Sequence, residues 1–339
     1  MFLRKGGKKL VKAIGLLSGG LDSTLAIKLV MEQGIDVFAM NFVTPFCTCT
    51  RRGCKLEAMR AAEELGVKLK VVAVGKEYIE LVKNPKYGYG KNMNPCIDCR
   101  IFMFRRAKQY MEEVGASFVF TGEVLGERPM SQRLEAMKII ERESGLEGRL
   151  LRPLSAKLLK PTIPELEGLV DRGRLLAIQG RSRKPQMALA QNFNIKDYPC
   201  PAGGCRLTDP GFAKRIKDAF QHNEDSLKDI ELLKYGRHFR LPSGAKVVVG
   251  RNKEENEVIL KMASPSSTLL EVRETPSPIT LLYKGIAQED IELAASICLR
   301  YSDYKDMDGK VYYWKKKNNV EKMVKVKKIG EDKLAEYRI

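Results

Sequence analysis

The stretch AIGLLSGGLDSTLAIKLV, residues 13–30, decides the fold. Its first five residues, AIGLL, are apolar and have the length of a buried strand. They lead into the glycine-containing turn SGGLDS (18–23). Beyond the turn, Leu25 and Leu29 recur at the spacing that places them on one face of a helix. A strand, a tight turn and an amphipathic helix in this order predict the first half of a βαβ crossover.

The same alternation continues to about residue 155. Further strands are predicted at DVFAMNFV (36–43), KLKVVAV (68–74) and SFVFTGE (117–123), and further helices at 56–65, 97–114 and 131–144. Strands that alternate with helices are typical of a parallel sheet covered by helices. We therefore expect an α/β domain over residues 1–155.

The turn SGGLDS has the chemistry of a phosphate site. It follows a strand and opens a helix, where unpaired backbone N–H groups and the helix dipole favour an anion. Gly19 and Gly20 permit close approach of the main chain, and the hydroxyls of Ser18 and Ser23 can donate to phosphate oxygens. Neither GxGxxG nor GxxxxGK[ST] is present, which disfavours the dinucleotide-binding and P-loop NTPase classes. The alternative is a serine-rich helix cap.

SGGLDS at the end of the first strand resembles the pyrophosphate loop of the ATP pyrophosphatases, whose Rossmann-like fold is shared by adenine nucleotide alpha hydrolases and by many tRNA sulfurtransferases. The stretch TGEVLGERPMSQRLEAM (121–137) is in addition similar to the TGE-x-LG…SQ-x-LE-x-M segment of the 4-thiouridine synthetases. The resemblance implies an ATP site made of Ser18, Gly19, Gly20, Asp22, Ser23, Met40, Asn41, Thr121 and Gly122.

The resemblance also implies a reaction. These enzymes cleave ATP between the α and β phosphates, and transfer of AMP to a uracil oxygen turns that oxygen into a group that sulfur can displace. The protein then supplies position and charge stabilisation, with Asp22 among the catalytic residues. Mg²⁺ is expected to neutralise the departing pyrophosphate, although no motif marks its ligands.

Seven of the eight cysteines fall into three groups. Cys96 and Cys99 in PCIDC lie three apart at a predicted helix start, where the dipole stabilises thiolates. In the sulfurtransferases that this chain resembles, two such thiolates and a third about a hundred residues later carry a persulfide or ligate an iron–sulfur cluster. Cys96, Cys99 and Cys200 match that arrangement, and we favour a 4Fe–4S cluster. Free sulfide, or a sulfur carrier with a cysteine desulfurase, would supply the sulfur.

Cys47, Cys49 and Cys54 form the second group, directly after the second strand. Ligands of open parallel sheets bind at this carboxyl edge. Three thiolates suggest zinc or a second cluster, or a sulfur relay near the ATP. Cys205, close to Cys200 in YPCPAGGC (198–205), is an alternative ligand or persulfide carrier. Cys298 lies among apolar residues and is expected in the core.

Residues 156–235 are expected to complete the catalytic domain. This segment contains the basic turn GRSRKPQ (180–186), in which Arg181, Arg183 and Lys184 would guide an RNA backbone toward the site or form a solvated turn.

From residue 236 the pattern changes to short alternating strands with one helix at 289–301. VVVGRNKEENEVIL (247–260) and AASICLRYSDYKDMDGKVYY (294–313) resemble the RNA-binding domain of the NFACT family. The resemblance implies a smaller α+β RNA-binding domain over 236–339, with Arg251, Asn252 and Asn256 in its recognition loop. Lys315, Lys316 and Lys317 would contact phosphates.

The charge of the whole chain agrees with a polyanionic partner. Sixty Lys and Arg against 42 Asp and Glu give a net charge of +18, which attracts nucleic acid. No apolar run approaches the roughly 20 residues needed to cross a bilayer, and we expect a cytoplasmic protein without membrane contact. The sequence thus predicts ATP-dependent thiolation of a tRNA uridine. The alternatives are a non-catalytic RNA-binding protein on a nucleotide-holding scaffold and an amidotransferase-like ligase.

Overall fold

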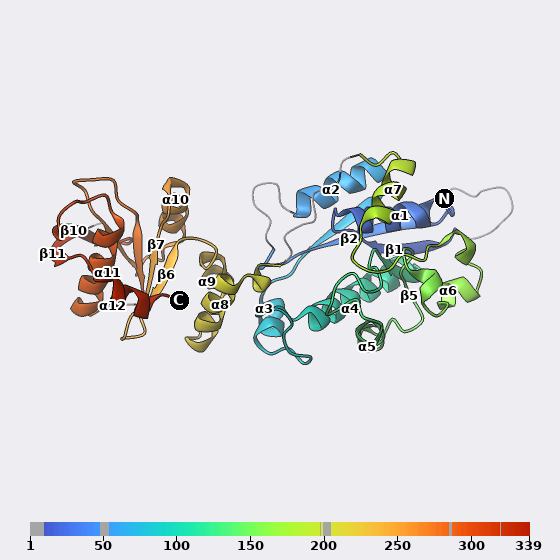
Figure 1. Cartoon of the computed structure of the whole chain (residues 1–339), viewed down its shortest axis with the longest axis horizontal. Helices are drawn as coiled ribbons and strands as arrows, with labels where there is room; N and C mark the ends of the chain where they lie inside the picture. The colour runs from blue at the N-terminus through green and yellow to red at the C-terminus, as the bar shows by residue number, and fades with distance from the viewer. Residues whose placement is uncertain (1–9, 48–53, 197, 199–204, 285–286, 319) are drawn as a thin grey trace. The chain divides into compact units, whose positions relative to one another are not determined.

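The computed structural model describes residues 10–47, 54–196, 198, 205–284, 287–318 and 320–339, which Figure 1 colours along the chain. The chain divides into two compact units. Unit 1 extends to Thr208, and unit 2 runs from Asp209 to Ile339.

Unit 1 is built on a parallel sheet. Its strands are β1 (Lys12–Leu16), β2 (Asp36–Val43), β3 (Lys68–Ala73), β4 (Phe118–Thr121) and β5 (Leu150–Leu151). They pair in the order β3-β2-β1-β4-β5, and every pair is parallel. The chain leaves β1 toward β2 on one side and returns to β4 on the other. Such a reversal of strand order opens a crevice beyond the carboxyl ends of β1 and β4, where ligands of α/β sheets bind.

Helices cover both faces of this sheet. They are α1 (Leu21–Met31), α2 (Cys54–Leu65), α3 (Lys76–Lys83), α4 (Cys96–Val114), α5 (Leu134–Ser144), α6 (Ile163–Leu166) and α7 (Lys184–Asn192), with 3₁₀ turns at Ala156–Leu158, Arg172–Arg174 and Arg206–Thr208. In Figure 1, α1, α2 and α7 lie on one side of the sheet and α4 and α5 on the other. Phe118 and Phe120 pack toward Ile27 on the first side, while Val119 packs with Phe104 on the second. This is the alternation that a buried strand requires.

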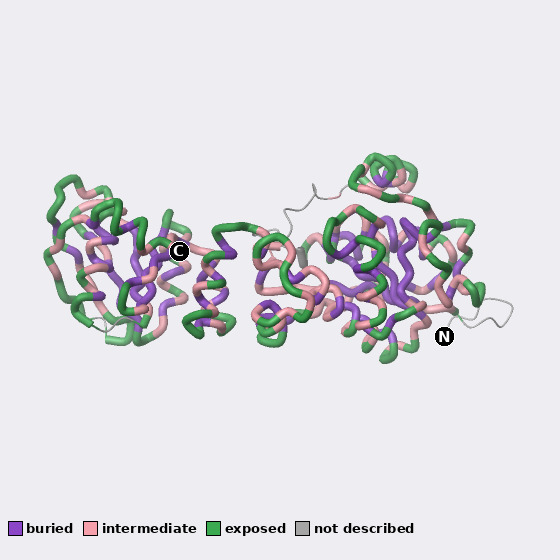
Figure 2. The backbone as a smooth tube through the Cα atoms, turned by 60° about the horizontal axis from the view of Figure 1, so that its bottom comes forward, coloured by how far each residue is buried: buried purple, intermediate pink, exposed green. Residues whose placement is uncertain are grey.

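Unit 2 contains an antiparallel sheet. Its strands are β6 (Arg237–Arg240), β7 (Lys246–Val249), β8 (Thr268–Glu271), β9 (Thr280–Tyr283), β10 (Asp308–Lys315) and β11 (Glu321–Lys327), in the order β11-β10-β8-β9-β7-β6. Its helices are α8 (Pro210–Gln221), α9 (Leu227–Leu232), α10 (Lys253–Met262), α11 (Gln288–Tyr301) and α12 (Glu331–Tyr337). Cys298 on α11 is fully buried in this core, as predicted. Figure 2 shows buried backbone along the strands of each unit.

The predicted fold class, a parallel α/β sheet with a separate smaller α+β domain, is confirmed. One difference concerns α8 and α9, which the sequence pattern places with the catalytic extension and the structure places in unit 2. Arg240 on β6 forms ion pairs with Asp218 on α8 and with Glu224, which also binds Lys246 on β7. These pairs hold both helices to the second sheet.

Candidate functional site

The predicted phosphate loop is held open by its own hydroxyl groups. Ser23 Oγ donates to the Gly20 carbonyl at 2.8 Å and accepts from the Ser18 backbone N–H at 3.2 Å. The hydroxyls of Ser18 and Ser23 are 3.1 Å apart. Gly20 is the N-cap of α1 and brings no side-chain hydrogen bond to the first turn. The first N–H groups of α1 therefore face the crevice without a side-chain cap, as an anion site requires.

Two glycines bring the neighbouring elements close to this loop. Gly19 has φ +80°, and a Cβ there would lie 2.6 Å from the Glu57 backbone at the start of α2. A Cβ at Gly122 would lie 2.4 Å from the Asp22 backbone. Both positions therefore need glycine, because the main chains of β4, α1 and α2 touch beside the loop.

Asp22 is a partly buried carboxylate at the start of α1. Its Oδ1 atom has no hydrogen-bond partner among the described residues. Burial raises the pKa of Asp22, while Arg183, Gln186 and Arg128 act in the opposite direction. An acceptor oxygen left unpaired next to cationic side chains is suited to a ligand that brings its own donors or a metal ion.

The other predicted ATP contacts lie at the same edge of the sheet. Met40 and Asn41 near the end of β2 are buried, as is Thr121 at the end of β4. The Asn41 amide donates to the Leu17 carbonyl at 2.8 Å, and its buried Oδ1 has no partner among the described residues. The structure thus gathers every predicted ATP contact around the ends of β1, β2 and β4.

The TGE-x-LG…SQ stretch forms a loop that presents Arg128. Gln132 fixes this loop, since its Oε1 accepts from the Arg128 N–H at 2.9 Å and its carbonyl accepts from Gly126 N–H at 2.7 Å. Glu123, 2% exposed, forms ion pairs with Arg100 on α4 at 3.2 Å and with Arg152 at 3.1 Å. The ion pairs of the buried Glu123 therefore anchor the start of the loop that carries the exposed Arg128.

Cys96 and Cys99 lie in the first turn of α4, as predicted. The hydroxyl of Tyr78 on α3 donates to Cys99 Sγ at 2.9 Å. Tyr78 is 2% exposed and packs against Phe46 and Phe102, with ring centroids 6.0 and 5.6 Å away. Burial raises the pKa of both thiols, and the nearby Arg100 opposes this for each of them.

Cys205 joins this pair together with Cys47. The backbones of Cys47 and Cys205 form an antiparallel bridge, and the Arg206 N–H donates to the Phe46 carbonyl at 3.0 Å. Burial raises the pKa of Cys205 to about 12, and the thiols of Cys99, Cys47 and Cys96 are close enough to add to that rise. We call Cys47, Cys96, Cys99 and Cys205 the thiol cluster.

The remaining predicted cysteine ligands are not placed. Cys49 and Cys200 lie outside the described residues, and Cys54 begins α2 without a described side chain. Among the residues that are described, no three His, Cys, Asp or Glu side chains are close enough to hold a single metal ion.

Arg128 connects the thiol cluster with the phosphate loop. Its charge acts to lower the pKa of Asp22 and also that of Cys96. The predicted RNA contact Arg183, at the N-cap of α7, acts on Asp22 as well. Its neighbours Arg181 and Lys184 are exposed. The phosphate loop, the cationic side chains and the thiols therefore share one edge of the sheet.

The predicted RNA contacts of unit 2 lie around the start of α10. Asn252 is the N-cap of this helix and accepts from the Glu255 N–H at 2.9 Å. Asn256 lies inside the helix, where the sequence pattern predicts a loop. Lys316 donates to the carbonyls of Leu260 and Ala263 at the end of the same helix.

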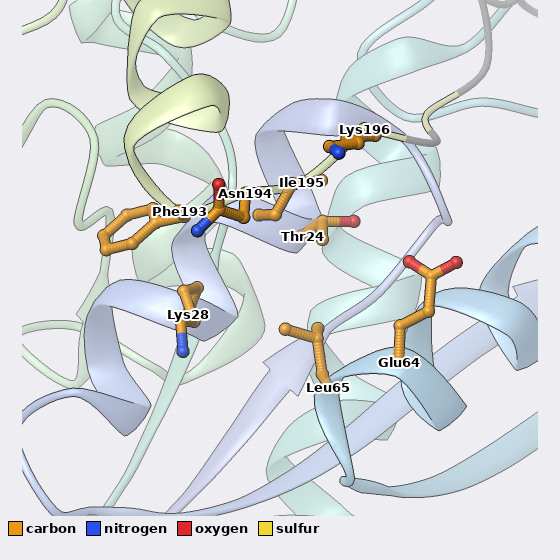
Figure 3. Close-up of a pocket in the computed structure, with 8 residues that line it drawn as sticks. All are labelled: Thr24, Lys28, Glu64, Leu65, Phe193, Asn194, Ile195 and Lys196. Carbon is orange, nitrogen blue, oxygen red and sulfur yellow. The ribbon is translucent and has the colours of Figure 1, made fainter.

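A pocket of about 330 Å³ lies beside α1, and its lining residue Thr24 directly follows Ser23 of the phosphate loop (Figure 3). Thr24 and Lys28 from α1, Glu64 and Leu65 from α2, and residues 193–196 line it. None of the predicted phosphate contacts or cysteines lines this pocket, so the pocket is not part of the candidate site.

Four residues of the site are missing from the sequence predictions: Tyr78, Arg100, Arg128 and Gln186. Arg100 directly follows Cys99, and Arg128 falls inside the quoted motif, so both had a local signal. Gln186 ends the basic turn 180–186, of which only the cationic residues were predicted to act. Tyr78 had no local signal, because it reaches the site only through the packing of α3.

Two family models match the chain. Residues 9–163 match the family described as thiamine biosynthesis protein (ThiI), and residues 236–338 match the NFACT protein RNA binding domain. A tRNA-specific 2-thiouridylase MnmA from Leptospira interrogans is 34% identical over 115 residues, which are 29% of this chain and 31% of that protein. The MnmA of Listeria monocytogenes is 23% identical over 319 residues, 87% of this chain and 83% of that protein.

Solved structures also show similarity. A 4-thiouridine synthetase in complex with RNA and with bound ATP has 22% identity and a TM-score of 0.37, covering 65% of this chain and 53% of that one. The U34-tRNA thiolase NcsA from Methanococcus maripaludis, with its [4Fe-4S] cluster, has 18% identity and a TM-score of 0.33, covering 67% and 74%.

Proposed function

We propose, on the premise that residues 9–163 form a ThiI-family domain and residues 236–338 an NFACT RNA-binding domain, that this chain is an ATP-dependent tRNA sulfurtransferase. It would adenylate a uracil carbonyl in tRNA and replace the oxygen with sulfur delivered by its cysteines. The proposed location is the cytoplasm. No described helix is long and apolar enough to cross a membrane.

One observation carries this proposal: residues 122–123 join the phosphate loop to the thiols, beside the exposed Arg128. Gly122 lies against the Asp22 backbone, and Glu123 forms an ion pair at 3.2 Å with Arg100, the residue after Cys99. The charge of Arg128 acts on both Asp22 and Cys96. A thiolase must bring a nucleotide, an acceptor base and a sulfur donor to one place. A phosphate loop or a thiol group alone would fit many proteins. An enzyme that uses both is expected to hold the phosphate loop and the thiols near a single cation such as Arg128. A positioned cation stabilises the charge that develops on phosphate and on the displaced oxygen.

The loop fits the phosphates of ATP. The first turn of α1 has no side-chain cap, Ser18 is exposed beside it, and Gly20 leaves the approach open. The unpaired oxygens of Asn41 and Asp22 are the acceptors available to a ligand at this edge. In the proposed reaction, the loop N–H groups hold the phosphates while Arg128 and Arg183 stabilise the departing pyrophosphate. Mg²⁺ held in part by Asp22 would assist them.

The thiol cluster fits an iron–sulfur group better than a single metal ion. Four sulfur donors are present, yet the described side chains do not converge on one point. Cysteines that hold a cluster bind different irons, so they need not converge. When bound, such a group would supply an iron that accepts sulfide. Tyr78 would support the Cys99 thiolate through its hydrogen bond, and the surrounding apolar rings would exclude water.

The raised pKa values of the thiols affect how the thiol cluster binds a metal group. Burial raises the pKa of Cys96, Cys99 and Cys205, which keeps these groups protonated at neutral pH without a ligand. Binding of a metal group therefore releases protons and weakens as the pH falls. A persulfide route would instead use two of these thiols with a sulfur carrier or a desulfurase as donor.

The test uses purified full-length protein, unmodified tRNA transcript, sulfide, Mg²⁺ and ATP. We expect AMP and pyrophosphate in a one-to-one ratio with thiouridine, measured by nucleoside mass spectrometry. Asp22→Asn and Cys96→Ser variants should lose thiouridine, and a Cys298→Ser variant serves as the matched control. Binding of tRNA without any AMP formation would leave the chain a non-catalytic RNA-binding protein and overturn the proposal.

A further inference from the structure

Four of the six residues predicted to contact RNA in unit 2 form contacts within the domain. Arg251, just before α10, forms a charge-assisted pair with Glu255, and the Asn252 side chain caps that helix. Asn256 Oδ1 accepts from the Ile279 N–H at 3.0 Å, and Lys316 donates to the Leu260 carbonyl. Lys315 and Lys317 are exposed, the first as the last residue of β10. The predicted contacts that remain available therefore lie at the end of β10.

Positive charge is concentrated in one hairpin. Residues 305–328 carry nine lysines against three acidic residues, a large share of the net charge of +18. Strands β10 and β11 make up most of this segment. The lysines at 310, 325 and 327 are exposed, and none forms an ion pair or hydrogen bond with any described residue. Their charges are free for a partner.

The strand register places these lysines on one face with an aromatic ring. Lys310 pairs with Lys325 across the two strands, Tyr312 with Met323, and Asp308 with Lys327. Residues directly opposite in an antiparallel pair share a face, and alternate residues along a strand do too. Val311, Tyr313 and Val324 point to the other face, where they pack in the core with α11. We call Lys310, Tyr312, Met323, Lys325 and Lys327 the hairpin face, which they share with Asp308, Trp314 and Glu321.

Two features of the hairpin face are costly without a ligand. Lys310 directly opposite Lys325 puts like charges together, which destabilises a sheet. Met323 is 49% exposed and Met307, before β10, is 64% exposed. Lysines on the edge strand β11 would also prevent pairing with another sheet. That role accounts neither for Lys310 on the inner strand β10 nor for the aromatic and apolar residues beside it.

The ring of Tyr312 lies beside a guanidinium. The Arg273 guanidinium is 5.5 Å from the ring centroid. Arg273 also pairs with Glu271 at 3.3 Å and with Glu321, so its charge offsets part of the negative charge next to the ring. Aromatic rings and guanidinium planes both stack on unpaired bases, and lysines beside them follow the phosphates.

We propose that the hairpin face binds an unpaired segment of RNA, with a base stacked at Tyr312 and phosphates at Lys310, Lys325 and Lys327. This inference rests on the proposed function for the identity of the RNA as tRNA. An acidic protein would use the charge without the ring. A membrane surface would use the charge and the methionines without stacking on the ring, so Tyr312→Ala would leave its binding unchanged.

The experiment measures binding of fluorescein-labelled tRNA to the full chain over a range of salt concentrations. Simultaneous Lys310→Ala, Lys325→Ala and Lys327→Ala substitutions are expected to weaken binding and to flatten the slope of log K against log salt by about 2, because each phosphate contact on a single strand contributes about 0.7. The control replaces the exposed lysines Lys228, Lys253 and Lys261 with Ala, which removes the same charge. Equal loss in both triple variants would overturn the proposal.

A second experiment tests whether a base stacks on the ring of Tyr312. Tyr312→Ala is expected to weaken binding about 5-fold or more, since stacking contributes about 1 to 3 kcal/mol per base, while Tyr312→Phe should bind as the parent does. A labelled oligouridine should compete, and a blunt RNA duplex of the same length should compete poorly. Competition by polyglutamate or by phosphatidylserine vesicles, with no effect of Tyr312→Ala, would assign the face to another partner. If the parent chain binds no tRNA, the proposed function fails instead.

Discussion

Cys205 is brought to the thiol cluster by its backbone. The backbone bridge to Cys47 and the hydrogen bond from the Arg206 N–H to the Phe46 carbonyl hold Cys205 next to the end of β2, although the two segments are far apart in the sequence. The resemblance implies Cys200 as the third ligand, with Cys205 as an alternative. Cys200 lies outside the described residues and stays a prediction, while the Cys205 thiol lies within electrostatic range of Cys47, Cys96 and Cys99.

Serine substitutions separate the two cysteines. Cys205→Ser is expected to abolish iron uptake and thiouridine formation, since the thiol cluster would lose a donor. Cys200→Ser, the matched control five residues away, is expected to retain both. Iron and labile sulfide content after anaerobic reconstitution, with nucleoside mass spectrometry of tRNA, measures the outcome. The reverse pattern would restore Cys200 as the ligand.

Tyr78 is predicted to lower the pKa of the Cys99 thiol through its hydrogen bond. Its hydrogen bond acts to lower the pKa of Cys99 against the larger effect of burial, so Tyr78→Phe should raise that pKa further. The rate of Cys99 alkylation in metal-free protein, followed by peptide mass spectrometry against pH, should shift to higher pH. Tyr89→Phe, which leaves the thiol untouched, is the control. An unchanged profile would remove Tyr78 from this role.

At the scale of elements, the site depends on how closely β4 approaches α1. Gly122 lies against the backbone of Asp22 and Ser23 with no space for a methyl group. The strand therefore cannot move toward α1, nor α1 toward the strand, without opening the phosphate loop.

Gly122→Ala should destabilise the fold by about 1–3 kcal/mol, as overpacking does, and should raise the KM for ATP. Gly330→Ala is the control, since a Cβ there meets nothing within 4 Å and its φ is −68°. Urea denaturation and ATP titration of AMP formation measure the two effects. Parental stability in Gly122→Ala would show that the contact is looser than described.

The ion pairs of Glu224 hold α8 and α9 to β6 and β7. Burial acts against the charge of Glu224, but Arg240 and Lys246 outweigh it and hold its pKa below the usual value. A carboxylate with a lowered folded pKa contributes stability that is present above its unfolded pKa, near pH 4, and is lost as the pH falls through the folded pKa.

Glu224→Gln is therefore expected to lose about 3–5 kcal/mol at neutral pH, because it leaves Lys246 buried without its partner. The difference from the parent should begin to shrink below about pH 4, where Glu224 of the unfolded parent takes up a proton, and should continue to shrink until the pH passes the lowered pKa of the folded state. The exposed Glu257→Gln is the control. Denaturant unfolding at pH 7 and pH 3.5 gives both values. A constant difference at the two pH values would contradict the assignment.

At the scale of the whole molecule, the division falls after Thr208. Asn92 donates to the Thr208 carbonyl at 2.7 Å and Met93 N–H to the Leu207 carbonyl at 3.1 Å, so the chain stays attached to unit 1 up to this point. The next helices belong to unit 2, where Leu232 packs with Val248 and Ile259.

Two truncations distinguish this division from one at residue 236. A chain that ends at Thr208 is expected to stay folded and monomeric and to bind ATP, while its affinity for tRNA falls. A chain that ends at Tyr235 keeps α8 and α9 without their sheet and should aggregate. Size-exclusion chromatography and circular dichroism measure folding, and fluorescence anisotropy measures tRNA binding. A well-behaved chain ending at Tyr235, with an unfolded one ending at Thr208, would move the boundary.

Local patterns in the sequence suffice to predict the first strand, the turn after it and the first helix. The strand AIGLL, the turn at Gly19 and Gly20 and the helix after it follow from periodicity and turn chemistry that act within a few residues. The structure has β1 at Lys12–Leu16 and α1 at Leu21–Met31, close to those limits. The resemblance implies a loop that holds Arg251, Asn252 and Asn256, whereas Asn256 lies inside α10, which Asn252 caps.

The sequence by itself therefore determined the strands and helices of the α/β unit, the glycine turn after β1 and the change of pattern at the basic domain, because each is encoded by residues that are near neighbours in the chain. Only the tertiary structure decided which thiols meet and which cation joins them to the loop. Those contacts bring Cys47 together with Cys205, and Asp22 with Arg128 and Arg183. Closing such long segments of chain requires the packing of whole helices and strands, and no short stretch of sequence encodes it.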